Sequence, residues 1–341
     1  MNTHVDIDHD RFQSIGSIAN ALVGNIRKER VWDGKPISEP GIYSGISLED
    51  YHGNRDLLDG PSISKSMLKW LVPAHGGSPK AFWGRWKWNP DHITPETTKA
   101  LDFGKAAHCL LLGDEVFEEQ FVVRPDTYPD EKTGNFKPWH PSSNVCKGWL
   151  EANAKGRTVI SRDDLKLIER MRADAAQHPL IQDGILNGRI ERSMFWKDPK
   201  TGIWLKARPD AIPRADGVFA DLKTASSFDE EFLEKQIFDA CYYLQAAITR
   251  MVCRGLDVPF DTFALLYILK DDVPDTTHAE VSVHEIDRGE QVVRWSLDKI
   301  RECLDSGEWP GARPFNDGTR HIQMKPWAKE KIDRFLEQEA A

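Results

Sequence analysis

Three strand-like segments followed by a helical one, all between residues 189 and 254, constrain the fold more than any other feature. The strand-like runs read RIERSMFWKD, GIWLKARPDAIP and GVFADLKT, and turn signals at residues 198–202 and 216–217 separate them. From Asp229 to Arg254 the apolar side chains recur at helical spacing, which predicts one long amphipathic helix. Adjacent strands with a helix packed across them predict an α/β fold.

The rest of the chain adds elements of both kinds. A short helix capped by Ser64, strands over 261–270 and 279–286, and further helices complete the pattern. The sequence therefore predicts a mixed central β-sheet flanked by helices. Residues 125–145 form the longest irregular stretch and are predicted to be a substrate-facing loop. The further helices are expected at about 98–113, 161–177, 289–306 and 326–339.

The predicted organisation has three parts. Residues 1–40 are polar and weakly periodic, so we expect a loosely ordered N-terminal segment. Residues 41–310 should form the main domain, with a helical N-terminal part over 60–180 and a catalytic sheet core over 185–290. A C-terminal loop and helix over 311–341 complete the chain. Its 341 residues, 40% of them hydrophobic, are enough to bury a large core.

Composition narrows the class of protein. No uncharged apolar run is long enough to span a bilayer, so we expect a cytoplasmic protein without membrane contact. Five widely spaced cysteines without a C-x-x-C pair argue against a disulfide framework, a zinc finger or an iron–sulfur cluster. The formal charge of −9 disfavours nucleic acid as a partner, although a site that holds divalent cations must itself be acidic.

One short motif suggests chemistry. Strand alternation in the run ADLKT places Asp221 and Lys223 on one face, and a hairpin with the preceding strand can bring Asp210 opposite Asp221. Two adjacent carboxylates suit a hard cation such as Mg²⁺, which lowers the pKa of a bound water. The lysine can hold that water or stabilise charge on a phosphate. Taken alone, the D-x-K motif is weak evidence for a catalytic site, because surface strands commonly carry an Asp–Lys pair.

Two further motifs strengthen this interpretation. Pro209-Asp210 followed by Asp221-Leu222-Lys223 resembles the P-D … D-x-K arrangement of the PD-(D/E)xK nucleases. Upstream, residues 104–108 (GKAAH) resemble the G-x-x-x-H motif of RecB-like and λ-exonuclease-like members. Gly104 and His108 share a helical face, so the glycine is expected to let the histidine approach a neighbouring strand. A lone histidine on such a helix is otherwise an ordinary core residue.

From about Gly41 to Trp309 the chain is similar to the RecE-like, exonuclease VIII group. The matching pieces are SISKSMLKWL, SPKAFW, FGKAAH, GRIERSMFW, KARPDAI, ADLKTA and YYLQAA. The resemblance implies a restriction-endonuclease-like core with an N-terminal helical elaboration. It implies Mg²⁺, with Mn²⁺ as a substitute, bound by His108, Asp210, Asp221 and the carbonyl of Leu222. It also implies Lys223 as the catalytic lysine and Glu191 as an assisting residue, although Glu191 is equally well a solvated strand residue.

Further side chains are candidate DNA contacts, and several of them have an alternative role. The family usually carries Q-x-x-x-Y after D-x-K, but Gln245 is followed by Thr249, so Tyr242 one turn earlier is the alternative aromatic hydroxyl. RecB-like members often have a glycine three residues before the metal-binding aspartate, and here that position is Ala207. The remaining candidates are Arg208 (phosphate contact or acid partner), Thr224 and Ser226 (phosphate contacts or turn formers), and Lys80, Arg85 and Lys87 beside tryptophans expected in the core.

What the resemblance implies about activity is specific. It implies an exodeoxyribonuclease that digests linear double-stranded DNA from the 5′ end, hands a 3′ overhang to a single-strand annealing protein, and forms a ring-like homo-oligomer. It also implies a phage or prophage protein in a bacterial host cell. Two alternatives stay open: another PD-(D/E)xK nuclease, RecB-like or CRISPR-associated, and a non-catalytic DNA-end-binding protein.

Overall fold

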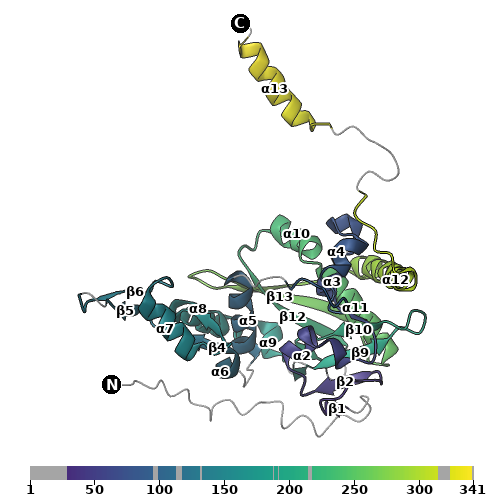
Figure 1. Cartoon of the computed structure of the whole chain (residues 1–341), viewed down its shortest axis with the longest axis horizontal. Helices are drawn as coiled ribbons and strands as arrows, with labels where there is room; N and C mark the ends of the chain where they lie inside the picture. The colour runs from purple at the N-terminus through teal and green to yellow at the C-terminus, as the bar shows by residue number, and fades with distance from the viewer. Residues whose placement is uncertain are drawn as a thin grey trace.

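Two five-stranded β-sheets form the centre of the protein in the computed structural model (Figure 1). The structure describes residues 29–94, 99–112, 117–130, 133–186, 188–190, 192–213, 217–313 and 323–339. The first sheet has the order β1-β2-β9-β10-β3. Its strands are β1 (Arg30–Val31), β2 (Gly41–Ser44), β3 (Ser62–Ile63), β9 (Ser193–Lys197) and β10 (Trp204–Ala207).

The second sheet contains the D-x-K strand and has the order β14-β13-β12-β11-β8. Its strands are β8 (Arg189–Ile190), β11 (Ala211–Ile212), β12 (Val218–Ala225), β13 (Thr262–Leu269) and β14 (Thr276–Glu280). β12 and β13 are parallel, and every residue of β12 has a partner in β13. Mixed pairing is thus confirmed, but the strands are divided between two sheets, whereas one central sheet was predicted.

The two faces of β12 and β13 bury different cores. Phe219, Phe263 and Leu265 belong to the large core that includes α11 (Tyr242–Gly255) and α12 (Val283–Ser306). Ala220 and Leu222 belong to a second core with α5 (Lys99–Leu112) and α8 (Arg162–Ala175). This alternation confirms that residues 221 and 223 lie on the face opposite residues 220 and 222. Helices therefore cover both faces of the sheet.

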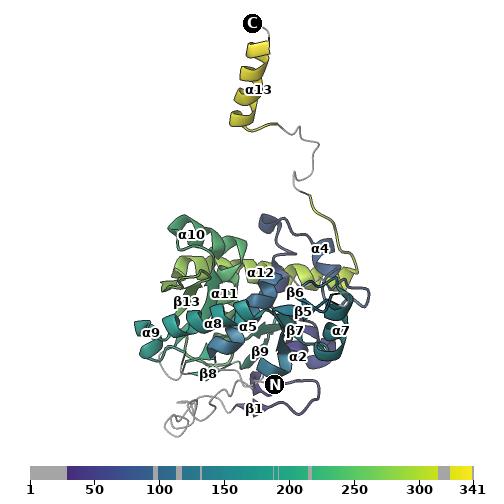
Figure 2. The same cartoon turned by 90° about the vertical axis from the view of Figure 1, so that its left-hand side faces the viewer.

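The remaining described helices are short; most lie around these cores, whereas α7 extends to one side, as Figures 1 and 2 show. A capping box between Ser161 and Asp164 starts α8 close to the predicted position. The others are α2 (Leu48–Gly53), α3 (Lys65–Leu68), α4 (Pro79–Trp83), α6 (Phe117–Gln120), α7 (Asn144–Asn153), α9 (Pro179–Gln182) and α10 (Glu230–Asp239), with 3-10 turns η2 (Arg55–Leu57) and η3 (Pro73–His75).

The helix predicted over 229–254 is in fact two helices. α10 ends at Asp239 and α11 starts at Tyr242, and Cys241 between them has a left-handed φ of 57°. Helical spacing of the apolar residues continues across this break, so periodicity did not reveal it. The break matters because it sets the direction of α11, whose first residues reach the D-x-K strand.

Three other sequence predictions need correction. The strand expected over 279–286 ends at Glu280, and α12 begins at Val283, because Ser282 caps a helix. Residues 125–145 contain an antiparallel hairpin of β5 (Thr127–Pro129) and β6 (Phe136–Pro138) instead of an irregular loop. Order begins before residue 41, since Ile37 is buried and bridges to Leu58. Residues 1–28 lie outside the described residues.

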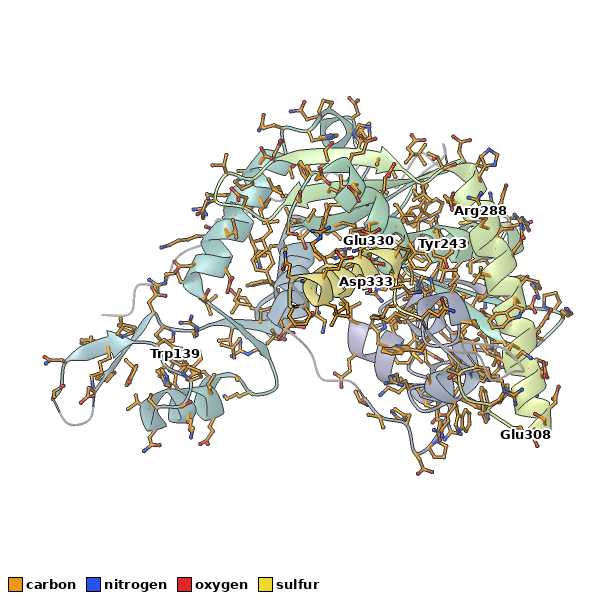
Figure 3. The ribbon with its side chains drawn as sticks, turned by 90° about the horizontal axis from the view of Figure 1, so that it is seen from above. Trp139, Tyr243, Arg288, Glu308, Glu330 and Asp333 are labelled. Atoms are coloured by element: carbon orange, nitrogen blue, oxygen red, sulfur yellow. The ribbon has the colours of Figure 1, made fainter. Side chains whose placement is uncertain are left out.

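Two parts of the chain project from the two-sheet body. The β5–β6 hairpin and α7 extend to one side, where Trp139 lies far from Tyr243 and Arg288 (Figures 1 and 3). At the C-terminus the predicted helix is present as α13 (Pro326–Glu339), which stands apart from the body. β4 (Phe121–Val123) and β7 (Thr158–Ile160) pair in a small parallel sheet near α5. Over the described ranges, no helix combines the length and apolar character needed to cross a bilayer.

Candidate active site

The hairpin between β11 and β12 brings the two predicted carboxylates together. Ala211 pairs with Ala220 in antiparallel register, so continuing that register by one residue sets Asp210 opposite Asp221. Asp210 lies directly before β11 and after Arg208 and Pro209, at the point where the chain passes from the first sheet to the second. Proline has no N–H for a ladder, which favours a break between β10 and β11 at this point.

Asp210 is held by contacts from two other elements. Its Oδ1 lies 2.7 Å from Nε2 of His108 on α5, and its Oδ2 accepts a hydrogen bond from the backbone N–H of Leu222. Burial opposes ionisation, but the charges of His108 and Lys223 and these bonds hold the pKa of Asp210 below its usual value. The predicted approach of His108 to a strand is thus present. The role given to Gly104 is wrong, because a Cβ there would have open space around it.

Asp221 is the other buried carboxylate of the site. Lys223 donates a hydrogen bond to its Oδ2, and Nε2 of Gln245 on α11 lies 2.6 Å from its Oδ1. Burial and the negative charge of Asp210 raise the pKa of Asp221 above its ordinary value. The two carboxylates therefore have opposite tendencies: Asp210 stays ionised, and Asp221 resists ionisation until more positive charge arrives.

Lys223 completes the group on the same face of β12. Although burial disfavours its charged form, the carboxylates of Asp221 and Asp210 raise the pKa of Lys223. Its ammonium also lies 5.1 Å from the ring centroid of Tyr242. A lysine whose pKa is raised stays protonated at neutral pH, so this side chain can donate hydrogen bonds and stabilise negative charge but cannot accept a proton.

A divalent cation would find oxygen donors here. The buried pair Asp210 and Asp221 repel one another, and Oε1 of Gln245 is buried without a hydrogen-bond partner among the described residues. Carboxylate oxygens suit Mg²⁺, and an unpartnered amide oxygen suits a water of its hydration shell. In the described ranges, however, no three or more His, Cys, Asp and Glu side chains converge as a metal site. The donor chemistry fits Mg²⁺ best around the two carboxylates.

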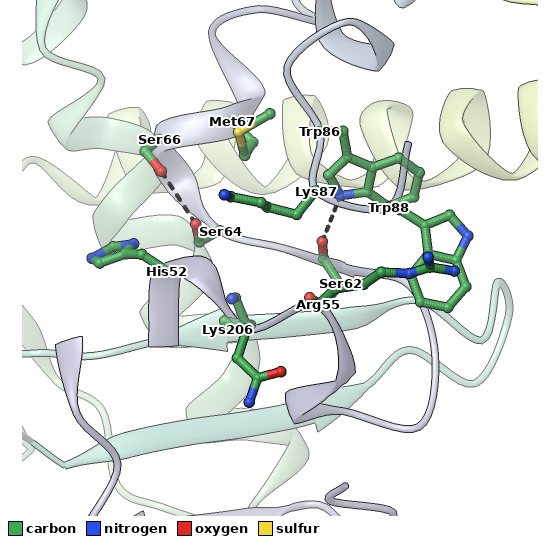
Figure 4. Close-up of a pocket in the computed structure, with 11 residues that line it drawn as sticks. His52, Arg55, Ser62, Ser64, Ser66, Met67, Trp86, Lys87, Trp88 and Lys206 are labelled. Carbon is green, nitrogen blue, oxygen red and sulfur yellow. Dashed lines mark hydrogen bonds between the residues drawn. The ribbon is translucent and has the colours of Figure 1, made fainter. Parts of the chain in front are cut away.

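A small pocket of about 70 Å³ lies beside α3 (Figure 4). Its lining contains the cationic side chains of Arg55, Lys87 and Lys206 together with His52, and no carboxylate among the described residues. Ser64 and other serines, with tryptophans, supply the rest of the wall: Ser62, Ser66, Asn54, Met67, Trp86 and Trp88. Such a lining suits an anion, and its size suits a phosphate group.

Lys206 is a desolvated cation in the wall of this pocket. Its Nζ donates to the carbonyl of Tyr51 and lies 4.7 Å from the centroid of the Tyr51 ring. Burial lowers the pKa of Lys206 to about 8, and the described part of the chain offers it no carboxylate. A desolvated cation without an anion is destabilising by itself, so binding an anion in the pocket would offset that penalty.

A second cleft of about 260 Å³ has Tyr242 in its wall. Thr224, Ser226 and Tyr267 line it together with aromatic side chains. The hydroxyl of Tyr267 is buried without a partner in the described ranges, and burial raises the pKa of Tyr267 to about 12. Thr224, Ser226 and Tyr242, all predicted as DNA contacts, therefore border this cleft, and Tyr242 also lies beside Lys223.

Other predicted residues make contacts outside the group of Asp210, Asp221 and Lys223. Arg208 donates to the carbonyl of Ile46 and to Ser193 Oγ, so its guanidinium ties β10 to neighbouring segments. Arg85 stacks 4.0 Å from the Trp70 ring centroid. Lys80 is exposed on α4, and Lys87 lines the pocket of Figure 4.

For two predicted site residues, Glu191 and Leu222, these contacts do not test the expected role. Glu191 lies outside the described residues. Leu222 contacts the site through its N–H bond to Asp210, whereas the prediction concerned its carbonyl.

Two lysines near the centre did not emerge from the sequence. Lys65 lies in the SISKSMLKWL segment, which indicated only a helix cap, and Lys206 belongs to a strand without a motif of its own. The cap itself is only partly correct: α3 begins at Lys65, but the Ser64 hydroxyl bonds to Ser66 and not to the helix backbone. The available signals were their position in segments that resemble the RecE-like group and, for Lys206, strand alternation, which predicts that it shares a face with Asp210.

The hairpin that sets P-D against D-x-K, within sheets covered by helices, defines a PD-(D/E)xK-like fold. The chain belongs to the family described as "PDDEXK-like domain of unknown function (DUF3799)", whose model matches residues 64–313. The crystal structure of a protein from Eubacterium rectale, described as a "Putative exonuclease", is similar in fold with a TM-score of 0.54 and 15% identity, covering 85% of this chain and 98% of that one. No curated protein matches the sequence.

Proposed function

We propose that this protein is a metal-dependent deoxyribonuclease that hydrolyses phosphodiester bonds of linear double-stranded DNA, from the 5′ end. Membership of a PDDEXK-like family and the fold shared with a protein described as an exonuclease support a nuclease. The observation that carries the proposal is the pairing of buried Asp210 and Asp221 beside protonated Lys223. The resemblance to the RecE-like group supports the finer statements on substrate, polarity and phage-type recombination.

The proposed reaction is hydrolysis with a balanced exchange of bonds. A water oxygen attacks phosphorus, the P–O3′ bond breaks, and the products are a 5′-phosphate and a 3′-hydroxyl. Asp210 and Asp221, with His108, would hold Mg²⁺ or Mn²⁺, which polarises the phosphoryl group and activates water when bound. Lys223 donates hydrogen bonds to the phosphate oxygens, on which negative charge increases in the transition state.

The cationic pocket supports a nucleic acid as substrate. The overall charge of −9 opposes DNA binding, but Arg55, Lys87 and Lys206 concentrate positive charge within one pocket. A DNA strand bound at the carboxylates would have a neighbouring phosphate available for this pocket. A ring-like homo-oligomer and a single-strand annealing partner belong to the proposal through the RecE-like resemblance alone.

The direct test uses linear and covalently closed duplex DNA, with and without Mg²⁺. Loss of linear DNA alone supports the exonuclease, cutting of both forms indicates an endonuclease, and binding without cutting indicates a DNA-end-binding protein. Lys223→Ala should lower turnover by roughly a hundredfold to a thousandfold while sparing metal binding. Lys197→Ala on β9 is the matched control and should keep full activity; wild-type turnover by Lys223→Ala would refute the mechanism.

A further inference from the structure

Two ammonium groups lie against the ring of Tyr242. Nζ of Lys223 and Nζ of Lys65 are each 5.1 Å from its centroid. Lys223 comes from β12 and is bonded to Asp221, whereas Lys65 is the first residue of α3. The first turn of α3 therefore brings a second lysine to the same tyrosine that borders the two carboxylates.

Lys65 differs from Lys223 in having no hydrogen-bonded carboxylate among the described residues, although the charge of Asp221 attracts it at longer range. The structure gives it no hydrogen bond and no ion pair with any residue in the described ranges, only the face of Tyr242. Burial, and then the positive charge of Lys223, outweigh the attraction of Asp221 and lower the pKa of Lys65 to about 8. A desolvated ammonium that a second ammonium repels is unfavourable, so an anion bound beside Tyr242 would be attracted by both lysines.

The surroundings indicate which anion fits. The neighbours Ser64 and Ser66 line the cationic pocket of Figure 4, while Lys65 lies on the side of Tyr242 and Lys223. Residues 64–66 therefore border two positively charged sites. One is the pocket that Ser64 and Ser66 line, and the other is the region beside Tyr242 where Lys65 and Lys223 lie. Anionic groups spaced regularly along one strand, as in a nucleic acid backbone, match that arrangement better than a single small anion.

We propose that Lys65 is a second substrate-binding lysine, which contacts a nonbridging oxygen of the phosphodiester presented to Asp210, Asp221 and Lys223. This inference rests on the proposed function, because it names the residue that positions the strand at the same site. Lys223 acts on the reacting phosphate from β12, and Lys65 fixes the strand from α3. The contact adds binding energy before and during the reaction, so its loss raises KM more than it lowers kcat.

The test separates charge from packing with two substitutions. Lys65→Met keeps the length and apolar stem of the side chain, and Lys65→Arg keeps the charge. If Lys65 binds phosphate, Met should raise KM and the Kd for linear duplex roughly tenfold to a hundredfold, and Arg should restore most of the loss. If Lys65 only packs on Tyr242, Met should behave as wild type and Arg should be the defective variant.

The salt dependence of DNA binding tests the same contact independently. Losing one phosphate contact lowers the slope of log Kobs against log salt by about 0.9 for duplex DNA. The matched control is Lys69→Met, one turn later on the same segment, where the ammonium lies 5.1 Å from the Trp70 ring and the side chain is exposed. It should leave KM, Kd and the slope unchanged.

The outcomes distinguish this inference from the proposed function. If wild type neither binds nor cuts DNA, the proposed function fails and this inference fails with it. If wild type is active and Lys65→Met matches Lys69→Met in KM, Kd and salt slope, the role of Lys65 is refuted while the nuclease stands. Thermal unfolding of each variant shows that the fold is intact, since removing a desolvated ammonium should not lower the melting temperature.

Discussion

Replacing Lys206 by methionine should stabilise the protein, although lysine is the natural residue. Burial lowers the pKa of Lys206 from 10.5 to about 8. At about 1.4 kcal/mol for each pKa unit, this corresponds to about 3 kcal/mol of destabilisation at neutral pH. Part of the side chain reaches the pocket, and Lys206→Met also removes the bond to the Tyr51 carbonyl, worth about 1 kcal/mol, so we expect a net gain of about 1–2 kcal/mol.

The sign of the pH dependence follows from the lowered pKa. Below pH 8 the amine of Lys206 is protonated in both the folded and unfolded chains, so the whole penalty applies. Between pH 8 and 10.5 the unfolded chain still holds a proton that the folded protein has lost, so the penalty shrinks as pH rises and is absent above 10.5. The advantage of Lys206→Met should therefore be largest at pH 7 and small at pH 10.

Thermal unfolding measured at pH 7 and pH 10 provides the assay. Lys206→Met should melt a few degrees above wild type at pH 7 and close to it at pH 10. The control is Lys197→Met on the adjacent strand, because its partly exposed ion pair with Asp59 at 2.9 Å contributes little and should give a small loss at both pH values. A variant less stable than wild type at pH 7, or an advantage that does not change with pH, would refute the reasoning.

Three further predictions concern packing, charge and the C-terminus. Gly255→Ala should lower the free energy of unfolding by about 1–3 kcal/mol, because a Cβ there would lie 2.2 Å from Nε1 of Trp196. Adding Trp196→Phe should recover part of this free energy, as measured by denaturant unfolding. Asp221→Asn should raise the melting temperature in EDTA at pH 7, because a carboxyl group whose pKa is raised destabilises the fold at that pH. The difference in melting temperature between variant and wild type should shrink as the pH is lowered. An unchanged melting temperature at pH 7 would contradict the burial argument. Removing residues 314–341 should leave the melting temperature of the body unchanged, since the described residues of α13 bury no side chain; a drop of several degrees by calorimetry would show that this segment packs on the body.

Much of the local structure could be read from short-range patterns. Alternation in ADLKT predicted that Asp221 and Lys223 share a face, and the cores on the two sides of β12 confirm it. The turn at residues 216–217 predicted the hairpin whose register sets Asp210 opposite Asp221. These features depend on residues fewer than fifteen positions apart, for which the periodicity of the side chains is sufficient information.

What the sequence could not predict are the contacts between distant segments. Three features depend on which elements pack together. They are the desolvation of Lys206 and Lys65, the bond of His108 to Asp210 across 102 positions, and the change of sheet at Pro209. The break at Cys241 also escaped prediction, because the apolar spacing on either side is the same. The sequence by itself determined which chemical groups are available and which local faces they occupy. Tertiary packing alone decided which of those groups lose water and meet, because desolvation and charge interactions depend on distance in space and not on distance along the chain.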